Sequence, residues 1–130
     1  MRHLLALALA LATVACGKDK LSPPDPTRYQ AMRAEERCQA VAPRATPCID
    51  ELLVADMTDV MGSAGREAAQ QLDDEVHKRR ASGEEAAAMH RLQCAGSPRY
   101  PDAVVACWTT ETCKAFADCV IRVEHAAPAR

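Results

Sequence analysis

Seven cysteines in a chain of 130 residues constrain its fold more than any other feature. Aromatic residues make up only 3% of the chain, namely Tyr29, Tyr100, Trp108 and Phe116. Because each buried aromatic side chain removes a large apolar area from water, a core built mainly from Ala, Val, Leu and Met is weak for its length. Disulfides compensate for weak cores in exported domains, so the cysteine content predicts a small cross-linked domain.

The first 15 residues have the three-part pattern of a secretory signal peptide. Arg2 and His3 supply a basic flank, residues 4–12 form an apolar run, and small residues follow. This order is typical of a leader that is removed from the mature protein. The apolar run is shorter than the roughly 20 residues that a membrane-spanning helix needs. We therefore expect an exported protein and assign residues 1–15 to a signal peptide.

Cys16 directly follows this leader. The sequence Thr13-Val14-Ala15-Cys16 resembles the lipobox of bacterial lipoproteins, except that the family most often has Leu where this chain has Thr13. The resemblance implies that Cys16 is acylated after cleavage and anchors the protein in the inner or outer membrane of the envelope. The alternative is an ordinary leader cut after Ala15. The cysteine count favours lipidation, because removing Cys16 leaves an even set for pairing: Cys38, Cys48, Cys94, Cys107, Cys113 and Cys119.

The mature chain divides into three expected parts. Residues 16–26 are polar and rich in proline, which is typical of an extended tether. Residues 27–125 are expected to form a cysteine-rich domain, and residues 126–130 a disordered tail. The formal net charge of the chain is −2, and no basic stripe is present, so a nucleic-acid partner is not expected.

Apolar residues at helical spacing predict an all-α domain, a bundle of about five helices cross-linked by disulfides. Pro43 and Pro47 are expected to end the first helix, and Gly62 the second. Ser82 matches a capping box, and Asp102 is a candidate cap for a short helix. No alternating run of β-branched residues indicates a sheet. The expected helical segments are 27–41, 48–62, 65–80, 82–96, 102–107 and 111–124.

Six cysteines allow 15 pairings, and turn positions suggest one of them. A Cys38–Cys48 bond would clamp the proline turn, and a Cys107–Cys113 bond would clamp the Thr109-Thr110 turn. Cys94 and Cys119 would then form the third bond. A zinc cluster or a thiol-redox centre is the rival interpretation, but the chain has no CxxC pair.

One set of side chains could bind a metal ion. Thioether and imidazole groups favour copper, and two of the methionines lie four residues apart on one predicted helix. In the alternative interpretation the methionines fill gaps in the core and the histidines are solvated. No metal or cofactor is assigned, and the candidate residues are Met57, Met61, His77, Met89 and His90.

No catalytic motif emerges from the sequence. Glu84 and Glu85 are adjacent on a predicted helix, where they do not face each other, and no phosphate loop or cofactor motif is found. Residues 107–119 resemble the tail of small cysteine-rich helical lipoproteins of deltaproteobacteria, a resemblance that implies no catalytic residues. We therefore expect a non-enzymatic envelope lipoprotein that contacts the membrane through its lipid and an unknown envelope protein through its domain. The alternative is a periplasmic metal-binding or metal-sensing protein.

Overall fold

A computed structural model describes residues 21–62, 66–78 and 80–126. These residues form seven α-helices and one short 3₁₀-helix, and they contain no strand. The all-α prediction is therefore confirmed over the described part of the chain. The signal peptide, Cys16 and residues 127–130 lie outside it. The helices are α1 (Pro26–Ala31), α2 (Ala34–Ala45), η1 (Thr46–Cys48), α3 (Ile49–Met61), α4 (Arg66–Lys78), α5 (Gly83–Gly96), α6 (Tyr100–Ala106) and α7 (Cys113–Glu124).

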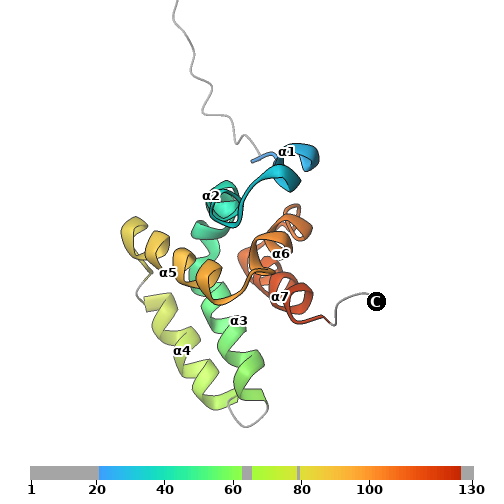
Figure 1. Ribbon diagram of the computed structural model, residues 1–130. Helices are drawn as coiled ribbons and strands as arrows, with labels where there is room; N and C mark the ends of the chain where they lie inside the picture. The colour runs from blue at the N-terminus through green and yellow to red at the C-terminus, as the bar shows by residue number, and fades with distance from the viewer. Residues whose placement is uncertain (1–20, 63–65, 79, 127–130) are drawn as a thin grey trace, which may run out of the picture.

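The helices pack around one core and leave a two-helix projection. α2 packs against α5 and α6, while α7 packs against α3 and α6. α4 packs mainly along α3, and these two helices run side by side away from α1 and α2 (Figure 1). None of the described helices is both long and apolar enough to cross a bilayer.

The core uses all four aromatic residues. Phe116 and Tyr100 are 0% and 1% exposed, and Tyr29 and Trp108 are also buried. Valine and alanine supply most of the remaining buried side chains, as expected, but leucine contributes only Leu52. None of the described methionines is fully buried, but Met32 and Met89 pack against the core from partly buried positions, so methionine contributes to the edge of the core and not to its centre.

The helix expected over residues 27–41 is two helices. Met32 and Arg33 have extended backbone and separate α1 from α2. Glu36 accepts a hydrogen bond from the Arg33 backbone nitrogen at 2.8 Å, which caps α2. Arg37 donates to the carbonyl oxygens of Tyr29 and Gln30 at 3.2 and 2.8 Å. The bond to Tyr29 O adds to the one that Met32 N donates at 3.1 Å, and both Arg37 bonds hold carbonyl groups at the end of α1, which stabilises the break.

Two predicted helix boundaries at proline and aspartate are also wrong. Pro43 lies inside α2, which continues to Ala45. The last turn is retained because Ala45 is fully buried and Thr46 Oγ1 donates to Ala42 O at 2.8 Å. Asp102 does not cap α6, which begins at Tyr100; its carboxylate accepts a hydrogen bond from Tyr29 Oη at 2.7 Å.

Other boundaries agree with the sequence. α3 ends at Gly62, whose φ of 58° suits glycine. Ser82 caps α5 by accepting from the Glu85 backbone nitrogen at 3.2 Å. The expected tether meets the folded body early, because Trp108 Nε1 donates to Leu21 O at 2.6 Å. Within the described part of the chain, a residue of the expected tether, Leu21, therefore already contacts the folded body, N-terminal to the expected start at residue 27.

Three disulfides form, as predicted, but with different partners. The observed bonds are Cys38–Cys94, Cys48–Cys113 and Cys107–Cys119. The predicted pairs Cys38–Cys48, Cys107–Cys113 and Cys94–Cys119 are all wrong. The physical reason differs between the two turns: Cys38 and Cys48 pair with different, more distant helices, whereas Cys107 bonds across its turn to α7, but to Cys119 and not to Cys113. Cys38 on α2 faces Cys94 on α5, and Cys48 at the start of α3 faces Cys113 at the start of α7.

Candidate functional site

The structure does not bring the predicted metal-binding methionines and histidines together around His90. Met89 and His90 lie on α5, whereas Met57 and Met61 lie on the second half of α3. The side chain of His77 lies outside the described residues. His90 is 2% exposed rather than solvated, and both of its ring nitrogens have close partners. Nδ1 lies 3.1 Å from Tyr100 Oη, and Nε2 lies 2.8 Å from Cys38 O.

The hydrogen bonds of His90 define one protonation pattern. Burial raises the pKa of the Tyr100 hydroxyl, which therefore stays protonated and can donate to His90 Nδ1. Nε2 then carries the ring hydrogen and donates to Cys38 O. Burial also lowers the pKa of His90 below its ordinary value of 6.5, so the neutral ring is the favoured form. In this state both ring nitrogens of His90 are engaged in hydrogen bonds, so His90 does not bind a metal ion together with the methionines.

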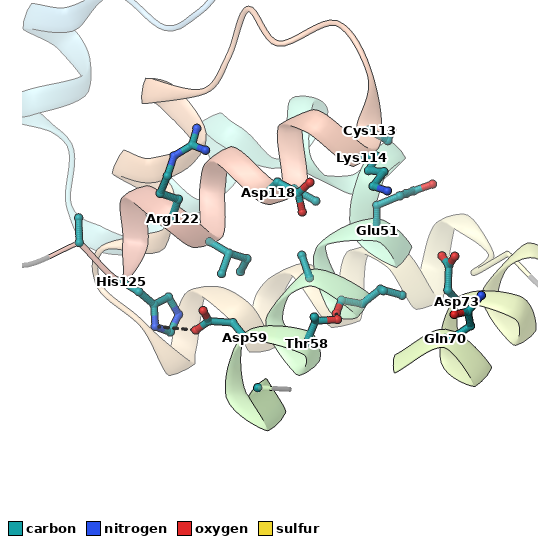
Figure 2. Close-up of a pocket in the computed structure, with 16 residues that line it drawn as sticks. Glu51, Thr58, Asp59, Gln70, Asp73, Cys113, Lys114, Asp118, Arg122 and His125 are labelled. Atoms are coloured by element: carbon teal, nitrogen blue, oxygen red, sulfur yellow. Dashed lines mark hydrogen bonds and ion pairs between the residues drawn. The ribbon is translucent and has the colours of Figure 1, made fainter. Parts of the chain in front are cut away.

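An open groove of about 1340 Å³ lies between α3, α4 and α7. Figure 2 shows α7 along one side of this groove and α3 and α4 along the other. One face of α3 lines it from Glu51 to Gly62, at positions three and four residues apart. With a rise of 1.5 Å per residue, this face is about 16 Å long.

The floor of the groove is apolar and shallow. α3 contributes Val54 and Ala55, and α7 contributes Ala117 and Ile121. Ala117 and Ile121 are buried, and the other two are partly buried. Short side chains on two adjacent helices allow another helix to approach their backbones closely, because packing distance depends on the side chains at the contact.

The two rims of the groove differ in charge. On α7, Lys114 and Arg122 flank Asp118, and all three side chains are exposed. The opposite rim is acidic, with Asp59 on α3 and Asp73 on α4. Figure 2 shows these side chains on opposite sides of the groove. A ligand that lies along the groove would therefore meet mostly positive groups on one flank and negative groups on the other.

Fixed contacts close the two ends of the groove. At one end, His125 Nδ1 lies 3.4 Å from Asp59 Oδ2, which joins α7 to α3. At the other end, the Cys48–Cys113 disulfide joins the starts of α3 and α7. Glu51 on α3 follows Cys48 by three residues. Its Oε1 forms an ion pair with Arg80 at 2.6 Å. Its other oxygen, Oε2, is buried and has no hydrogen-bond partner among the described residues.

The sequence analysis missed this groove. The available signal was a second apolar face on α3, formed by Val54 and Ala55, in addition to the face that enters the core through Ile49 and Leu52. A helix with two apolar faces has two sets of neighbours, but the pattern does not show that one face stays uncovered. The lining of the groove requires the observed packing of α7 on α3.

The comparisons with known proteins assign no family to the chain. No protein-family model matches it, and no curated protein or solved structure matches it significantly.

Proposed function

We propose that this protein is a non-enzymatic lipoprotein of the bacterial cell envelope that binds a helix of a partner protein in the groove between α3, α4 and α7. The leader and Cys16 support the lipid anchor, because their sequence resembles a signal peptide with a lipobox. Three disulfides favour an oxidising compartment outside the cytoplasm. The groove carries the proposal for the binding activity.

The shape of the groove suits an amphipathic helix. The face of α3 that lines the groove is about 16 Å long, which corresponds to three helical turns, and its apolar part is Val54 and Ala55, beside Ala117 and Ile121 of α7. Recognition of a helix in such a groove places apolar residues at i, i+3, i+4 and i+7 on the floor. The partner helix would pack on α3 and α7 in addition to their present neighbours, and it would cover the partly buried Val54.

The rim charges indicate which helix would fit. Acidic residues of the partner would face Lys114 and Arg122 on α7, and basic residues would face Asp59 and Asp73. A basic group at the Glu51 end would also lie near a carboxylate, whose buried Oε2 has no hydrogen-bond partner among the described residues. Complementary charges of this kind fix orientation and exclude wrong partners more than they add affinity.

The groove is also placed away from the expected anchor. In Figure 1 the first described residues lie beside α1, and the far ends of α3 and α4 lie at the opposite end of the molecule. Thr58 and Asp59, which line the groove, are near that far end of α3. A protein tethered through its N-terminus would therefore present the groove away from the membrane surface.

Site-specific photocrosslinking in intact cells tests this proposal. A photoreactive residue at Thr58, which is exposed in the groove, should give a specific adduct with one envelope protein. The same residue at Gln39, which is exposed on α2, is the matched control and should not give that adduct. Reversing two rim charges with Lys114→Glu and Arg122→Glu should reduce the Thr58 adduct at least about tenfold, since like charges across an interface are unfavourable.

A second control shows whether the loss of the Thr58 adduct comes from the rim charges or from any change in the net charge of the protein. Arg91→Glu changes the charge of an exposed residue on α5 and should leave the Thr58 adduct unchanged. The proposal fails if Thr58 and Gln39 give the same adducts, or if the double reversal has no more effect than Arg91→Glu.

A further inference from the structure

A second cluster of chemically reactive groups lies away from the groove, between α2 and α5. The side chains of Cys38, His90 and Cys94 each offer a ligand atom, and these three atoms all lie within 4.8 Å of one another. His90 Nε2 is 3.4 Å from Cys38 Sγ and 3.7 Å from Cys94 Sγ. Two sulfur atoms and one imidazole nitrogen are a typical ligand set for zinc.

The two nitrogen–sulfur distances fit tetrahedral coordination, whereas the sulfur–sulfur distance fits it only after the disulfide is broken. With Zn–S near 2.3 Å and Zn–N near 2.0–2.1 Å, the sulfur–nitrogen edge of a tetrahedron is about 3.5 Å. The two observed nitrogen–sulfur distances are close to this edge. The two sulfur atoms are now bonded, and they would have to separate to about 3.8 Å around a zinc ion.

The ligands are held by two helices. His90 and Cys94 are four residues apart on α5, so their side chains share one helix face. Cys38 comes from α2, which packs against α5. The rest of the imidazole is fixed by Tyr100, whose Oη lies 3.1 Å from His90 Nδ1. Zinc-bound histidines commonly have such an outer partner on the second ring nitrogen.

We propose that Cys38, Cys94 and His90 form a zinc site when the Cys38–Cys94 disulfide is reduced, so that the disulfide and the metal are alternative states of one site. The first step is reduction by a dithiol. One thiolate of the dithiol attacks a sulfur atom of the disulfide, the other cysteine leaves as a thiolate, and the second thiol of the reductant releases the first cysteine. The dithiol is oxidised to a disulfide, and two cysteine thiols form.

Zinc binding then displaces protons. Zn²⁺ replaces the two thiol hydrogens, which are released to solvent. The ring hydrogen of His90 moves from Nε2 to Nδ1, so the hydrogen bond from Nε2 to Cys38 O is broken, and the Tyr100 hydroxyl turns so that its oxygen accepts from Nδ1. A solvent molecule can complete the coordination sphere, because Cys94 is only partly buried. This inference is independent of the groove between α3 and α7.

The other two disulfides lack this arrangement. Among the described residues, the cluster around His90 is the one group of at least three cysteine, histidine or acidic side chains close enough to hold a metal ion. Cys48 Sγ has the Arg44 guanidinium 3.7 Å away, and a guanidinium does not ligate zinc. The structure thus provides an internal control, since Cys107 and Cys119 carry the same chemistry without an imidazole.

Differential alkylation tests the proposal on the unaltered protein. The mature protein is reduced with a water-soluble phosphine, which becomes a phosphine oxide with oxygen from water. It is then treated with iodoacetamide with and without one equivalent of Zn²⁺, and each cysteine is quantified by peptide mass spectrometry. Zinc should slow alkylation of Cys38 and Cys94 at least about tenfold and leave Cys107 and Cys119 within about twofold. Co²⁺ in place of Zn²⁺ should produce a thiolate-to-cobalt charge-transfer band.

Two variants separate the ligand from its support. His90→Gln should abolish selective protection, and Tyr100→Phe should weaken zinc affinity by about 10- to 100-fold, the usual effect of losing an outer partner. Circular dichroism of each oxidised variant shows whether it folds, and the wild-type alkylation experiment decides the question if one does not. Absence of zinc protection, or equal protection of all six cysteines, would overturn the proposal. So would a folded His90→Gln variant that binds zinc as tightly as wild type.

Discussion

Removing the Cys48–Cys113 disulfide should destabilise the domain more than removing the Cys107–Cys119 disulfide. The first bond closes a loop of 65 residues and the second a loop of 12 residues. In the chain-entropy relation, these loops correspond to about 4.3 and about 2.8 kcal/mol of stabilisation at 25 °C. The double variant Cys48→Ala/Cys113→Ala should therefore lose about 1.5 kcal/mol more unfolding free energy than Cys107→Ala/Cys119→Ala.

The two pairs are well matched in packing. Cys48 and Cys107 are 3% and 2% exposed, while Cys113 and Cys119 are both partly buried against the core. Truncation to alanine removes similar buried sulfur in each pair, so the packing loss largely cancels in the comparison. The difference between the variants then reports mainly on the restriction of the unfolded chain.

Urea unfolding of the mature domain, followed by circular dichroism, measures both free energies. Both variants should unfold at lower urea than wild type, with the Cys48/Cys113 variant first. Equal stabilities, or a less stable Cys107/Cys119 variant, would show that loop length does not set the contribution of these bonds. The reasoning from chain entropy would then be refuted for this protein.

Three further outcomes follow from particular residues. Gly62→Ala should lower the free energy of unfolding in urea by about 1–3 kcal/mol, because φ is 58° and ψ is −152° although the Cβ position is open. The control Gly96→Ala, which also has an open Cβ position and lies at the end of α5, should not destabilise the domain. Thermal melts should show stability falling as pH drops below about 6.5, since the unfolded chain protonates His90 more readily than the folded one; a folded His90→Gln variant that keeps the same pH slope would rule out this origin. Cys16→Ser should move the protein from membranes to the soluble periplasmic fraction, and a membrane-bound variant together with a wild type that incorporates no labelled fatty acid would reject lipidation.

Local patterns in the sequence predicted several helix ends correctly. Gly62 ends α3 and Ser82 caps α5, because each signal depends on the conformation of a few adjacent residues. The break between α1 and α2 could not be predicted in this way. It is stabilised by Arg37 on α2, whose side chain reaches back to the carbonyl of Tyr29 on α1, and no local propensity signal marks this contact between two helices.

The disulfide pairing depended on packing that the sequence does not encode locally. Two of the three bonds join residues separated by 56 and 65 positions. Turn geometry favoured nearby partners, but Cys38 on α2 bonds to α5, whereas Cys48 in η1 bonds to the start of α7. The role of His90 was also hidden, because its partner Tyr100 lies beyond the turn that ends α5.

The groove was unpredictable for a related reason. Its floor combines Val54 on α3 with Ile121 on α7, and either residue alone is consistent with an ordinary core position. Whether such a face is covered depends on the number and placement of the other helices. In this fold α4 packs mainly along α3, so the space between α4 and α7 stays open.

The pairing of the cysteines determines both candidate sites, since Cys48–Cys113 closes one end of the groove and Cys38–Cys94 contains the ligands of the zinc site. Tryptic mapping of the unreduced mature protein measures it directly. Cleavage after Arg37, Arg44, Arg91 and Arg99 isolates Cys38 in the peptide 38–44 and Cys94 in the peptide 92–99. These two peptides should be recovered as one disulfide-linked species that separates on reduction. Recovery of 38–44 linked instead to the peptide that contains Cys48 would contradict the fold.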